Sequence, residues 1–420
     1  MTSRERVEKA LNHEEPDRVP LDLGGTLASG MAASSVHKLR VALGLSKPGD
    51  SVKVTEPYQM LGEIDEDLRR TLGADCISLD SPKNFFGFEN KDWKHWKLFD
   101  GTPVRVPSAF NAQPDRNGNI SMYPQGDKTA SPSASMPKGG FYFDAIIRQE
   151  PIVEEKLKVE DHLEEYGPVS EQELRYYEQQ ADYLFRNTEY AIVGSFGGTS
   201  FGDIAIVPGM SLKHPKGIRD IEEWYISLLT RGDFVYEIFD RQCEIALSNL
   251  EMIRQAVQDK ISVIFITGTD FGAQEATFIS KDIYNKLFKP FHAKVNDWVH
   301  KNTQWRTLIH SCGCVEPLMK DFIEVGFDIL NPVQISASKL MDPMDLKQKY
   351  GEKIVFWGGG VNTQKTLPFG TSEEIDEEVK KLISIFSQGG GFVFAAVHNI
   401  QANIPVENIV ALFEAFKKYR

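Results

Sequence analysis

The sequence contains little cysteine and no long apolar run. Four cysteines among 420 residues are too few for a disulfide scaffold, and they indicate the reducing conditions of a cytoplasmic protein. No stretch of about eighteen apolar residues occurs, so the sequence predicts no membrane-spanning helix and no membrane partner. Residues 1–6 are polar and lack the apolar core of a secretion signal, so we expect no export.

Basic residues are in the minority. The 47 lysines and arginines are outnumbered by 60 acidic residues, which gives a net charge of −13. Nucleic-acid binding needs a cationic face, so this balance argues against nucleic acid as a main partner. Nucleotide-binding loops are also missing, because neither G-x-G-x-x-G nor a Walker motif occurs. The glycine triplets at 358–360 and 389–391 are interpreted as tight turns.

Short runs of β-branched and aromatic residues recur along the chain, and each ends in a polar or glycine-rich turn. Such near-continuous apolar runs are typical of a parallel sheet that is covered on both faces. Eight of them are found, at residues 18–25, 75–80, 191–198, 262–268, 307–310, 328–332, 353–360 and 391–397.

Helical patterns occupy several of the intervals. Residues 282–300 carry apolar side chains at a four-residue stride, residues 372–387 begin at Ser372 as the predicted N-cap, and a last helix is expected at 406–419. Strands alternating with helices predict an α/β fold, a (β/α)₈ TIM barrel, in a single domain over residues 1–420. A doubly wound open sheet is the alternative, because periodicity does not show whether a sheet closes.

Residues 81–150 break the alternation. Asp100-Gly101 and Asn117-Gly118 are hairpin signals, so we expect a hairpin-rich insertion in the barrel. It would be a lid or a partner-facing flap, or a surface decoration without a function. Its aromatic side chains could dock a partner or could pack against one another. They are Phe85, Phe86, Phe88, Trp93 and Trp96.

A histidine and a cysteine stand close together after one of the predicted strands. His310 ends the run 307–310 and Cys312 follows in the turn, so both side chains can point into one barrel mouth. Imidazole nitrogen and thiolate sulfur are ligands that zinc prefers, and a catalytic zinc typically has three protein ligands. His398 ends another apolar run and could be the third ligand if the two strands are neighbours. The alternative is a buried histidine beside a structural cysteine.

Several segments resemble the uroporphyrinogen decarboxylase superfamily. They are residues 5–20, His310-Ser311-Cys312-Gly313, Asn331-Pro332-Val333-Gln334, residues 356–360 and Pro405-Val406-Glu407-Asn408-Ile409. The similarity runs over almost the whole chain and is weakest in residues 81–150. It implies a distorted (β/α)₈ barrel, in agreement with the predicted strands.

One branch of that superfamily decarboxylates porphyrinogens. It carries an arginine-rich motif after the first strand, which grips the carboxylates of the substrate. Residues 21–30 of this chain contain no arginine. A tetrapyrrole with many carboxylates needs several guanidinium or ammonium partners, so a uroporphyrinogen-type decarboxylase is the disfavoured alternative.

The other branch consists of corrinoid-dependent methyltransferases. The chain resembles methylcobamide:coenzyme M methyltransferases and the methyltransferase components of O-demethylases. In that branch zinc is held by an H-x-C-G motif and by a cysteine seven residues before the proline of P-x-E-N-I. The resemblance maps these ligands onto His310, Cys312 and, with histidine in place of cysteine, His398. Glu275 or Cys314 could compete with His398.

Zinc that is bound by two nitrogen ligands and one sulfur ligand is a stronger Lewis acid than zinc bound by one nitrogen and two sulfurs. We therefore expect a small methylated substrate with a hard donor atom, such as a methoxylated compound, as methyl donor or acceptor. The methyl group would pass to or from the cobalt of a corrinoid (cobalamin). Because no D-x-H-x-x-G signature occurs, the corrinoid would be carried by a partner protein. The sequence is compatible with a homodimer, and a non-catalytic barrel that binds a partner is a further alternative.

Other polar residues near predicted strand ends are candidates for the reaction. Asp270 follows the fourth strand, and Glu56 lies in Glu56-Pro57-Tyr58-Gln59-Met60, which resembles a segment of aromatic demethylases. These two are expected to be catalytic. The residues expected to contact the substrate are Tyr58, Gln274, Asn331, Gln334 and Asn362. Each could instead cap an element or form a hydrogen bond within a loop.

Overall fold

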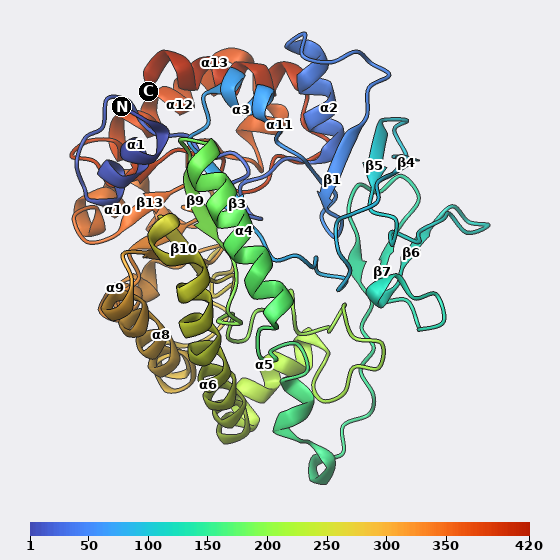
Figure 1. Cartoon of the computed structure of the whole chain (residues 1–420). Helices are drawn as coiled ribbons and strands as arrows, with labels where there is room; N and C mark the ends of the chain where they lie inside the picture. The colour runs from blue at the N-terminus through green and yellow to red at the C-terminus, as the bar shows by residue number, and fades with distance from the viewer.

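The computed structural model describes all 420 residues and contains a curled sheet of seven parallel strands (Figure 1). The strands follow the order β14-β13-β12-β11-β10-β9-β3. Their bounds are β3 (Cys76–Leu79), β9 (Ala191–Gly194), β10 (Val263–Thr267), β11 (Arg306–His310), β12 (Ile329–Asn331), β13 (Val355–Trp357) and β14 (Phe392–Val393). Seven of the eight predicted runs are thereby confirmed as strands.

The remaining run, residues 18–25, joins the two edges of this sheet. Leu21 forms a parallel bridge with Phe394, just beyond β14. Its carbonyl oxygen also accepts a hydrogen bond from the backbone N–H of Asp75, just before β3, at 2.7 Å. The sheet is therefore a distorted (β/α)₈ barrel, as the sequence predicted. The doubly wound open sheet is wrong, because these bonds connect both edges.

Helices cover the outer face of the barrel (Figure 1). Their bounds are α1 (Ser3–Leu11), α2 (Ala33–Ala42), α3 (Glu66–Leu72), α4 (Glu171–Asn187), α5 (Ile221–Thr230), α6 (Gly232–Val257), α7 (Lys281–Ile283), α8 (Lys289–Asn302), α9 (Met319–Glu324), α10 (Pro343–Tyr350), α11 (Thr366–Phe369), α12 (Ser372–Phe386) and α13 (Val406–Tyr419). Shorter helical turns are η1 (Pro124–Gly126), η2 (Glu154–Lys156), η3 (Val159–His162), η4 (Gln258–Lys260), η5 (Tyr284–Phe288), η6 (Glu316–Leu318) and η7 (Lys339–Met341).

The predicted helices differ from the observed ones in two details. Thr371, not Ser372, is the N-cap of α12, because its side chain accepts from the backbone of Glu374 and closes a capping box. The predicted helix 282–300 consists of α7, the π-helical turn η5 and α8. Pro290 in the first turn of α8 lacks a donor for a regular α-helical bond there. The helix predicted at 406–419 is confirmed as α13.

The barrel interior is packed, and α1 lies across its N-terminal end. One core cluster combines Val7, Ala10 and Leu11 of α1 with inward-facing strand residues such as Leu308 and Trp357. A much larger cluster of 73 buried residues fills the layer between the barrel and its helices. The N-terminal end is therefore closed by packing, and chemistry is left to the C-terminal end of the strands.

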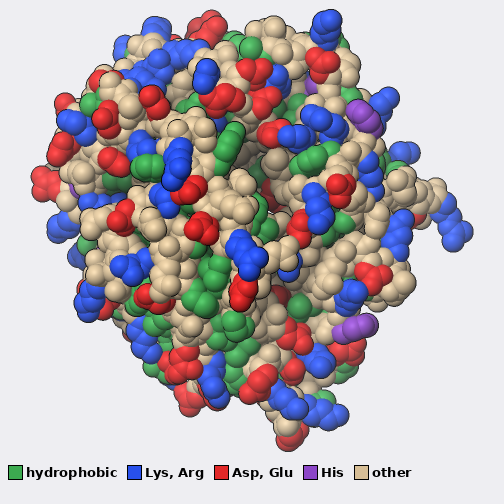
Figure 2. All heavy atoms as spheres, viewed as in Figure 1, with side chains coloured by type: hydrophobic (Ala, Val, Ile, Leu, Met, Phe, Trp, Pro, Cys, Tyr) green, Lys and Arg blue, Asp and Glu red, His purple; other side chains and the backbone are tan.

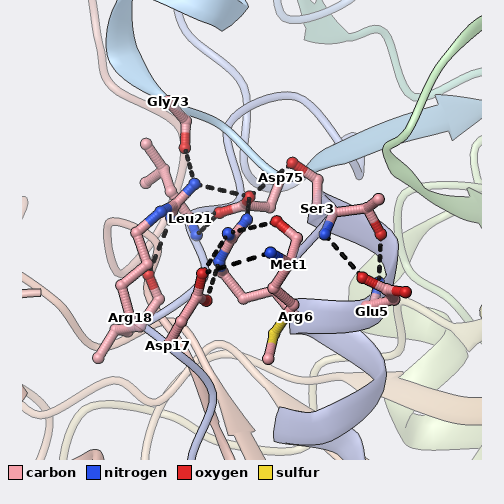
Figure 3. A network of polar contacts seen from close by, with 11 residues as sticks. Met1, Ser3, Glu5, Arg6, Asp17, Arg18, Leu21, Gly73 and Asp75 are labelled. Atoms are coloured by element: carbon pink, nitrogen blue, oxygen red, sulfur yellow. Dashed lines mark hydrogen bonds and ion pairs between the residues drawn. The ribbon is translucent and has the colours of Figure 1, made fainter.

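A buried aspartate, Asp75, connects α1 and residues 18–25 to the start of β3 (Figure 3). Asp75 is fully buried, and its carboxylate accepts from Arg6 at 2.7 Å and from Arg18 at 2.7 and 2.8 Å. It also accepts from Ser3 at 2.7 Å and from the backbone of Leu21 at 2.9 Å. Because all its lone pairs face donors, this ion pair tolerates its burial, and it fixes the point where the barrel closes.

Residues 81–150 lie to one side of the barrel (Figure 1). The predicted Asp100-Gly101 hairpin is confirmed, since β4 (Lys94–Lys97) and β5 (Pro103–Val106) pair antiparallel. They extend a sheet of order β2-β1-β5-β4 with β1 (Val52–Glu56) and β2 (Leu61–Gly62). A second small sheet consists of β6 (Ile120–Met122), β7 (Ala134–Met136) and β8 (Asp144–Ala145).

The insertion packs in a small core that also contains Ala33, Val54, Met60 and Met210 from other segments, and its aromatic side chains help to form this core. Phe86 is fully buried and Phe88 is almost so. Both belong to a cluster of 16 buried residues that also includes Phe110 and Phe143. Trp93 and Trp96 are only half-buried. Self-packing thus accounts for Phe86 and Phe88, which are not available to dock a partner.

None of the helices combines the length and the apolar character that crossing a membrane requires. On the face that Figure 2 shows, basic and acidic side chains are interspersed, and no extended area carries a single sign of charge.

Candidate metal centre

The end of β11 and the loops that follow β11 and β14 bring three potential metal ligands together. One ligand atom from each of His310, Cys312 and His398 lies within 4.8 Å of the other two. Nε2 of His310 lies 3.5 Å from Sγ of Cys312, and the centroids of the two imidazole rings are 5.5 Å apart. The strands themselves are not neighbours, because β12 and β13 separate β11 from β14. The curl of the barrel, rather than strand pairing, makes the cluster.

His310 is held from behind by the adjacent strand. Its Nδ1 lies 2.6 Å from Oδ1 of Asn331, whose Nδ2 donates to the carbonyl oxygen of Trp357 at 2.9 Å. The ring also stacks on Phe265, with 6.1 Å between centroids. Asn331 is only 1% exposed. The structure therefore places this predicted substrate contact behind His310, with both of its polar groups already bonded.

The loop that carries Cys312 is fastened to the loop after β10. The backbone N–H of Cys312 donates to Oδ1 of Asp270 at 2.7 Å, and that of Cys314 donates to the carbonyl oxygen of Ala273 at 2.7 Å. Cys314 is fully buried. It takes no part in the ligand cluster, and neither does Glu275.

Gly313 allows this close approach. Its φ is +83°, and a Cβ there would stand 2.2 Å from the carbonyl oxygen of Gly272, so only glycine fits. Its backbone N–H donates to Oε1 of Gln334 at 2.7 Å, and Nε2 of Gln334 reaches Gln274 at 3.5 Å. Gln334 is buried and Gln274 is exposed. In this structure Gln334 and Gln274, two of the predicted substrate contacts, hold the loop that carries Cys312.

The surroundings of Cys312 disfavour a free thiolate. Burial raises the pKa of the thiol well above its usual range, and the neighbouring Asp270 carboxylate raises it further. A thiolate therefore needs a compensating positive charge, and a divalent cation between the three side chains would supply it. Asp270, a predicted catalytic residue, is the acidic neighbour of Cys312 and the acceptor for its backbone.

His398 stands in an environment that keeps its imidazole neutral. Burial, and then the neighbouring His310, lowers the pKa of His398 to about 3. A neutral imidazole is the form that binds metal. The next residue, Asn399, is 1% exposed. It accepts from the backbone of Gly30 at 2.6 Å and donates to Gln59 at 2.8 Å, so the segment beyond β14 is locked to both neighbouring loops.

Glu56, the second predicted catalytic residue, shapes one of those loops. Its carboxylate accepts from the backbone N–H groups of Tyr58 at 2.9 Å and Gln59 at 2.7 Å. It is 4% exposed, and burial raises its pKa to about 7. Gln59 also bonds to Asn399, the residue next to His398, so Glu56 is connected indirectly to the ligand cluster. The oxygens of Glu56 itself face the turn that contains Tyr58 and Gln59.

Two other predicted substrate contacts serve local structure. Tyr58 packs with Phe85 and Phe86 at centroid distances of 5.9 and 6.2 Å. Oδ1 of Asn362 accepts from the backbones of residues 364 and 365. Asn362 and Glu275 line a separate surface hollow of about 1250 Å³, and neither belongs to the ligand cluster.

The sequence analysis did not single out Asp203 and Asn399, two buried polar residues near the candidate site. Asp203 follows β9, is 8% exposed, and has its pKa raised to about 6 by burial and then by Asp270. Asp203 follows a barrel strand, as Asp270 does, so the pattern that identified Asp270 could also have identified Asp203. Asn399 directly follows His398, so its position was visible, whereas its bonds to Gly30 and Gln59 are tertiary.

Residues 213–419 match the family model described as Uroporphyrinogen decarboxylase (URO-D). A curated uroporphyrinogen decarboxylase from Pseudoalteromonas atlantica is 30% identical over 79 residues, which are 19% of this chain. The match spans only 21% of the length of that relative.

A solved structure of a methyltransferase from Methanosarcina mazei has the same architecture. It superposes with a TM-score of 0.54 at 16% sequence identity, and the alignment covers 100% of this chain and 99% of that one. At this identity the likeness shows the fold and leaves the chemistry to the site. The match over residues 213–419 and the shared barrel are consistent with the uroporphyrinogen decarboxylase superfamily that the sequence resembles.

Proposed function

We propose that this chain is a zinc-dependent methyltransferase, which moves a methyl group between a small methylated substrate and the cobalt of a corrinoid protein. The observation that carries the proposal is the cluster of His310, Cys312 and His398, whose ligand atoms lie within 4.8 Å of one another. The sequence resemblance expected these three side chains to act together. The methyltransferase from Methanosarcina mazei, with its similar fold, is consistent with the proposal.

The three side chains fit a zinc ion. At metal–ligand distances of ~2.0–2.3 Å, tetrahedral ligand atoms lie ~3.3–3.8 Å apart. The His310–Cys312 separation of 3.5 Å already has this value, and the upper bound of 4.8 Å for the cluster requires shifts of about 1 Å at most. Three protein ligands would leave one position for a substrate, as in catalytic rather than structural zinc sites.

When bound there, zinc would act as a Lewis acid on the heteroatom that carries the methyl group. The surrounding residues hold the ligands in place. Asn331 orients His310, and Asp270 fixes the backbone of Cys312. Two nitrogens and one sulfur favour a hard donor such as an ether oxygen, so a methoxylated compound is the proposed substrate.

The corrinoid would arrive on a partner protein, since the chain contains no cobalamin-binding signature of its own. The partner would approach the C-terminal end of the barrel, because α1 occupies the other end. Cytoplasmic location and a homodimer are part of the same proposal. Neither changes the chemistry at the three ligands.

A porphyrinogen decarboxylase is the second candidate, favoured by the matching family model and by the curated relative. Residues 21–30, where that chemistry needs arginines, lie beside the ligand cluster, because Gly30 bonds to Asn399. They contain no guanidinium group to bind a carboxylate. We therefore rank methyl transfer first. A barrel that only binds a partner would have no use for three converging ligands.

Metal analysis of the purified chain tests the proposal. About one zinc per chain is expected from the three-ligand site, with loss of zinc in His310→Ala, Cys312→Ala and His398→Ala. Cys314→Ser and Glu275→Gln are matched controls and should keep the metal. Methylated compounds and a reduced corrinoid carrier are then combined, and the cobalt spectrum reports methyl transfer. Metal-free protein, or zinc that survives all three ligand substitutions, would refute the proposal.

A further inference from the structure

We infer that Asn331 is a positioning residue that makes Nε2, and not Nδ1, the metal-binding nitrogen of His310. The inference rests on the proposed zinc site and assigns Asn331 a role other than the substrate contact expected from the sequence. It follows from a short series of buried hydrogen bonds whose donors and acceptors can be assigned without ambiguity.

His310 and Asn331 face each other across two paired strands. They are direct partners in the parallel register of β11 and β12, so their side chains leave the sheet on the same side. Nδ1 of His310 and Oδ1 of Asn331 are 2.6 Å apart. With 1% of Asn331 and 6% of His310 exposed, water does not compete strongly for this bond.

The orientation of the amide is set by a backbone group. The carbonyl oxygen of Trp357 lies 2.9 Å from Nδ2 of Asn331, and a carbonyl oxygen can only accept. The NH₂ group of Asn331 must therefore face Trp357, and its Oδ1 must face His310. Because Trp357 is fully buried and fixed in β13, this orientation cannot be exchanged without leaving buried groups unpaired.

The tautomer of His310 follows from the same logic. An amide oxygen only accepts, so Nδ1 of His310 must carry the hydrogen. In the neutral ring Nε2 is then unprotonated and presents its lone pair to Cys312, 3.5 Å away. Supporting groups of this kind fix ring orientation and raise ligand basicity in metal sites.

The experiment has two readouts, and neither depends on enzymatic activity. ¹⁵N NMR of the metal-free chain identifies which nitrogen of His310 is protonated, and a competitive chelator titration gives the zinc affinity. Asn331→Leu removes the acceptor, and Asn331→Asp keeps it. Asn296→Leu is the matched control, since Asn296 is also fully buried and donates to a backbone carbonyl at 2.9 Å, and it lies on α8, which carries none of the three ligands.

We expect the Nδ1–H tautomer in the wild type and in Asn331→Asp. Asn331→Leu should mix the tautomers and weaken zinc binding about 10- to 100-fold, whereas Asn331→Asp restores affinity and Asn296→Leu leaves it unchanged. An Nε2–H tautomer in the wild type would overturn the inference. So would unchanged affinity in Asn331→Leu, or an equal loss in Asn296→Leu. Wild-type protein that binds no zinc refutes the proposed function instead, and the NMR result still decides the role of Asn331.

Discussion

Gly313 lies so close to Gly272 that a Cβ on the former would stand 2.2 Å from the carbonyl oxygen of the latter. This contact holds the cysteine loop against the loop after β10. We expect Gly313→Ala to push the two loops apart, to weaken zinc binding at least tenfold and to lower the free energy of unfolding. Gly44→Ala is the control, because Gly44 also has a positive φ but nothing within 4 Å. Urea unfolding should show Gly313→Ala to be less stable than this control by about 1–3 kcal/mol. Equal losses would mean that the backbone conformation alone matters.

Asp270 should control the reactivity of Cys312 in the metal-free protein. Its carboxylate raises the pKa of the thiol, so Asp270→Asn should lower that pKa and increase the thiolate fraction. Alkylation by iodoacetamide at pH 8 should become faster, by about tenfold for each unit of pKa. Cys312 is the one cysteine that is partly exposed, whereas the other three are buried, and Cys312→Ser should abolish the fast phase. A slower or unchanged rate in Asp270→Asn would show that the carboxylate does not act on the sulfur.

Glu56 should make the stability of the chain depend on pH. Burial raises its pKa from 4.5 to about 7 in the folded protein, so the folded state favours the protonated acid. Its contribution is therefore complete below about pH 4.5 and is lost as the pH rises through about 7. The shift corresponds to ~3 kcal/mol at ~1.4 kcal/mol per unit. Urea unfolding at pH 5 and pH 8 should show a smaller decline in Glu56→Gln than in the wild type. The exposed Glu171→Gln should decline like the wild type, and a Glu56→Gln curve parallel to both would contradict the assignment.

Asp75 should be critical for closure of the barrel. Asp75→Asn leaves Arg6 and Arg18 without their buried acceptor, and breaking a buried ion pair typically costs about 3–5 kcal/mol. Asp17→Asn also removes a partner of Arg6, but Asp17 is 44% exposed, so its loss should cost less than about 1 kcal/mol. Thermal or urea unfolding measures both. Similar losses in the two variants would show that Asp75 is not the centre of the network.

Local patterns in the sequence were sufficient to predict the strands of the barrel but not its closure. Runs such as 262–268 and 353–360 are apolar on both faces, and a strand with helices on one side and a packed interior on the other requires that composition. The same patterns could not show that residues 18–25 close the sheet with single bridges. Nor could they show that Thr371 rather than Ser372 caps α12, since adjacent hydroxyl residues differ only in backbone geometry.

The candidate ligands were predictable, but the roles of their neighbours were not. His310, Cys312 and His398 each follow an apolar run, which places them at the same end of the barrel. Asn331 ends a strand and Gln334 follows it, and in the structure their side chains bond to His310 and to the loop that carries Cys312. These bonds depend on register and loop contact between strands, and a single sequence does not contain this information.

The ligand cluster includes His398 from the loop after β14, the last barrel strand, which lies beside the bridge between Phe394 and Leu21. During synthesis, two of the three proposed metal ligands, His310 and Cys312, emerge well before His398. A ribosome-bound chain that ends before β14 would offer the ion only two of the three ligands, His310 and Cys312. Tight metal retention would therefore report that synthesis has passed His398 and that the barrel has closed, and products terminated before β14 would remain metal-poor.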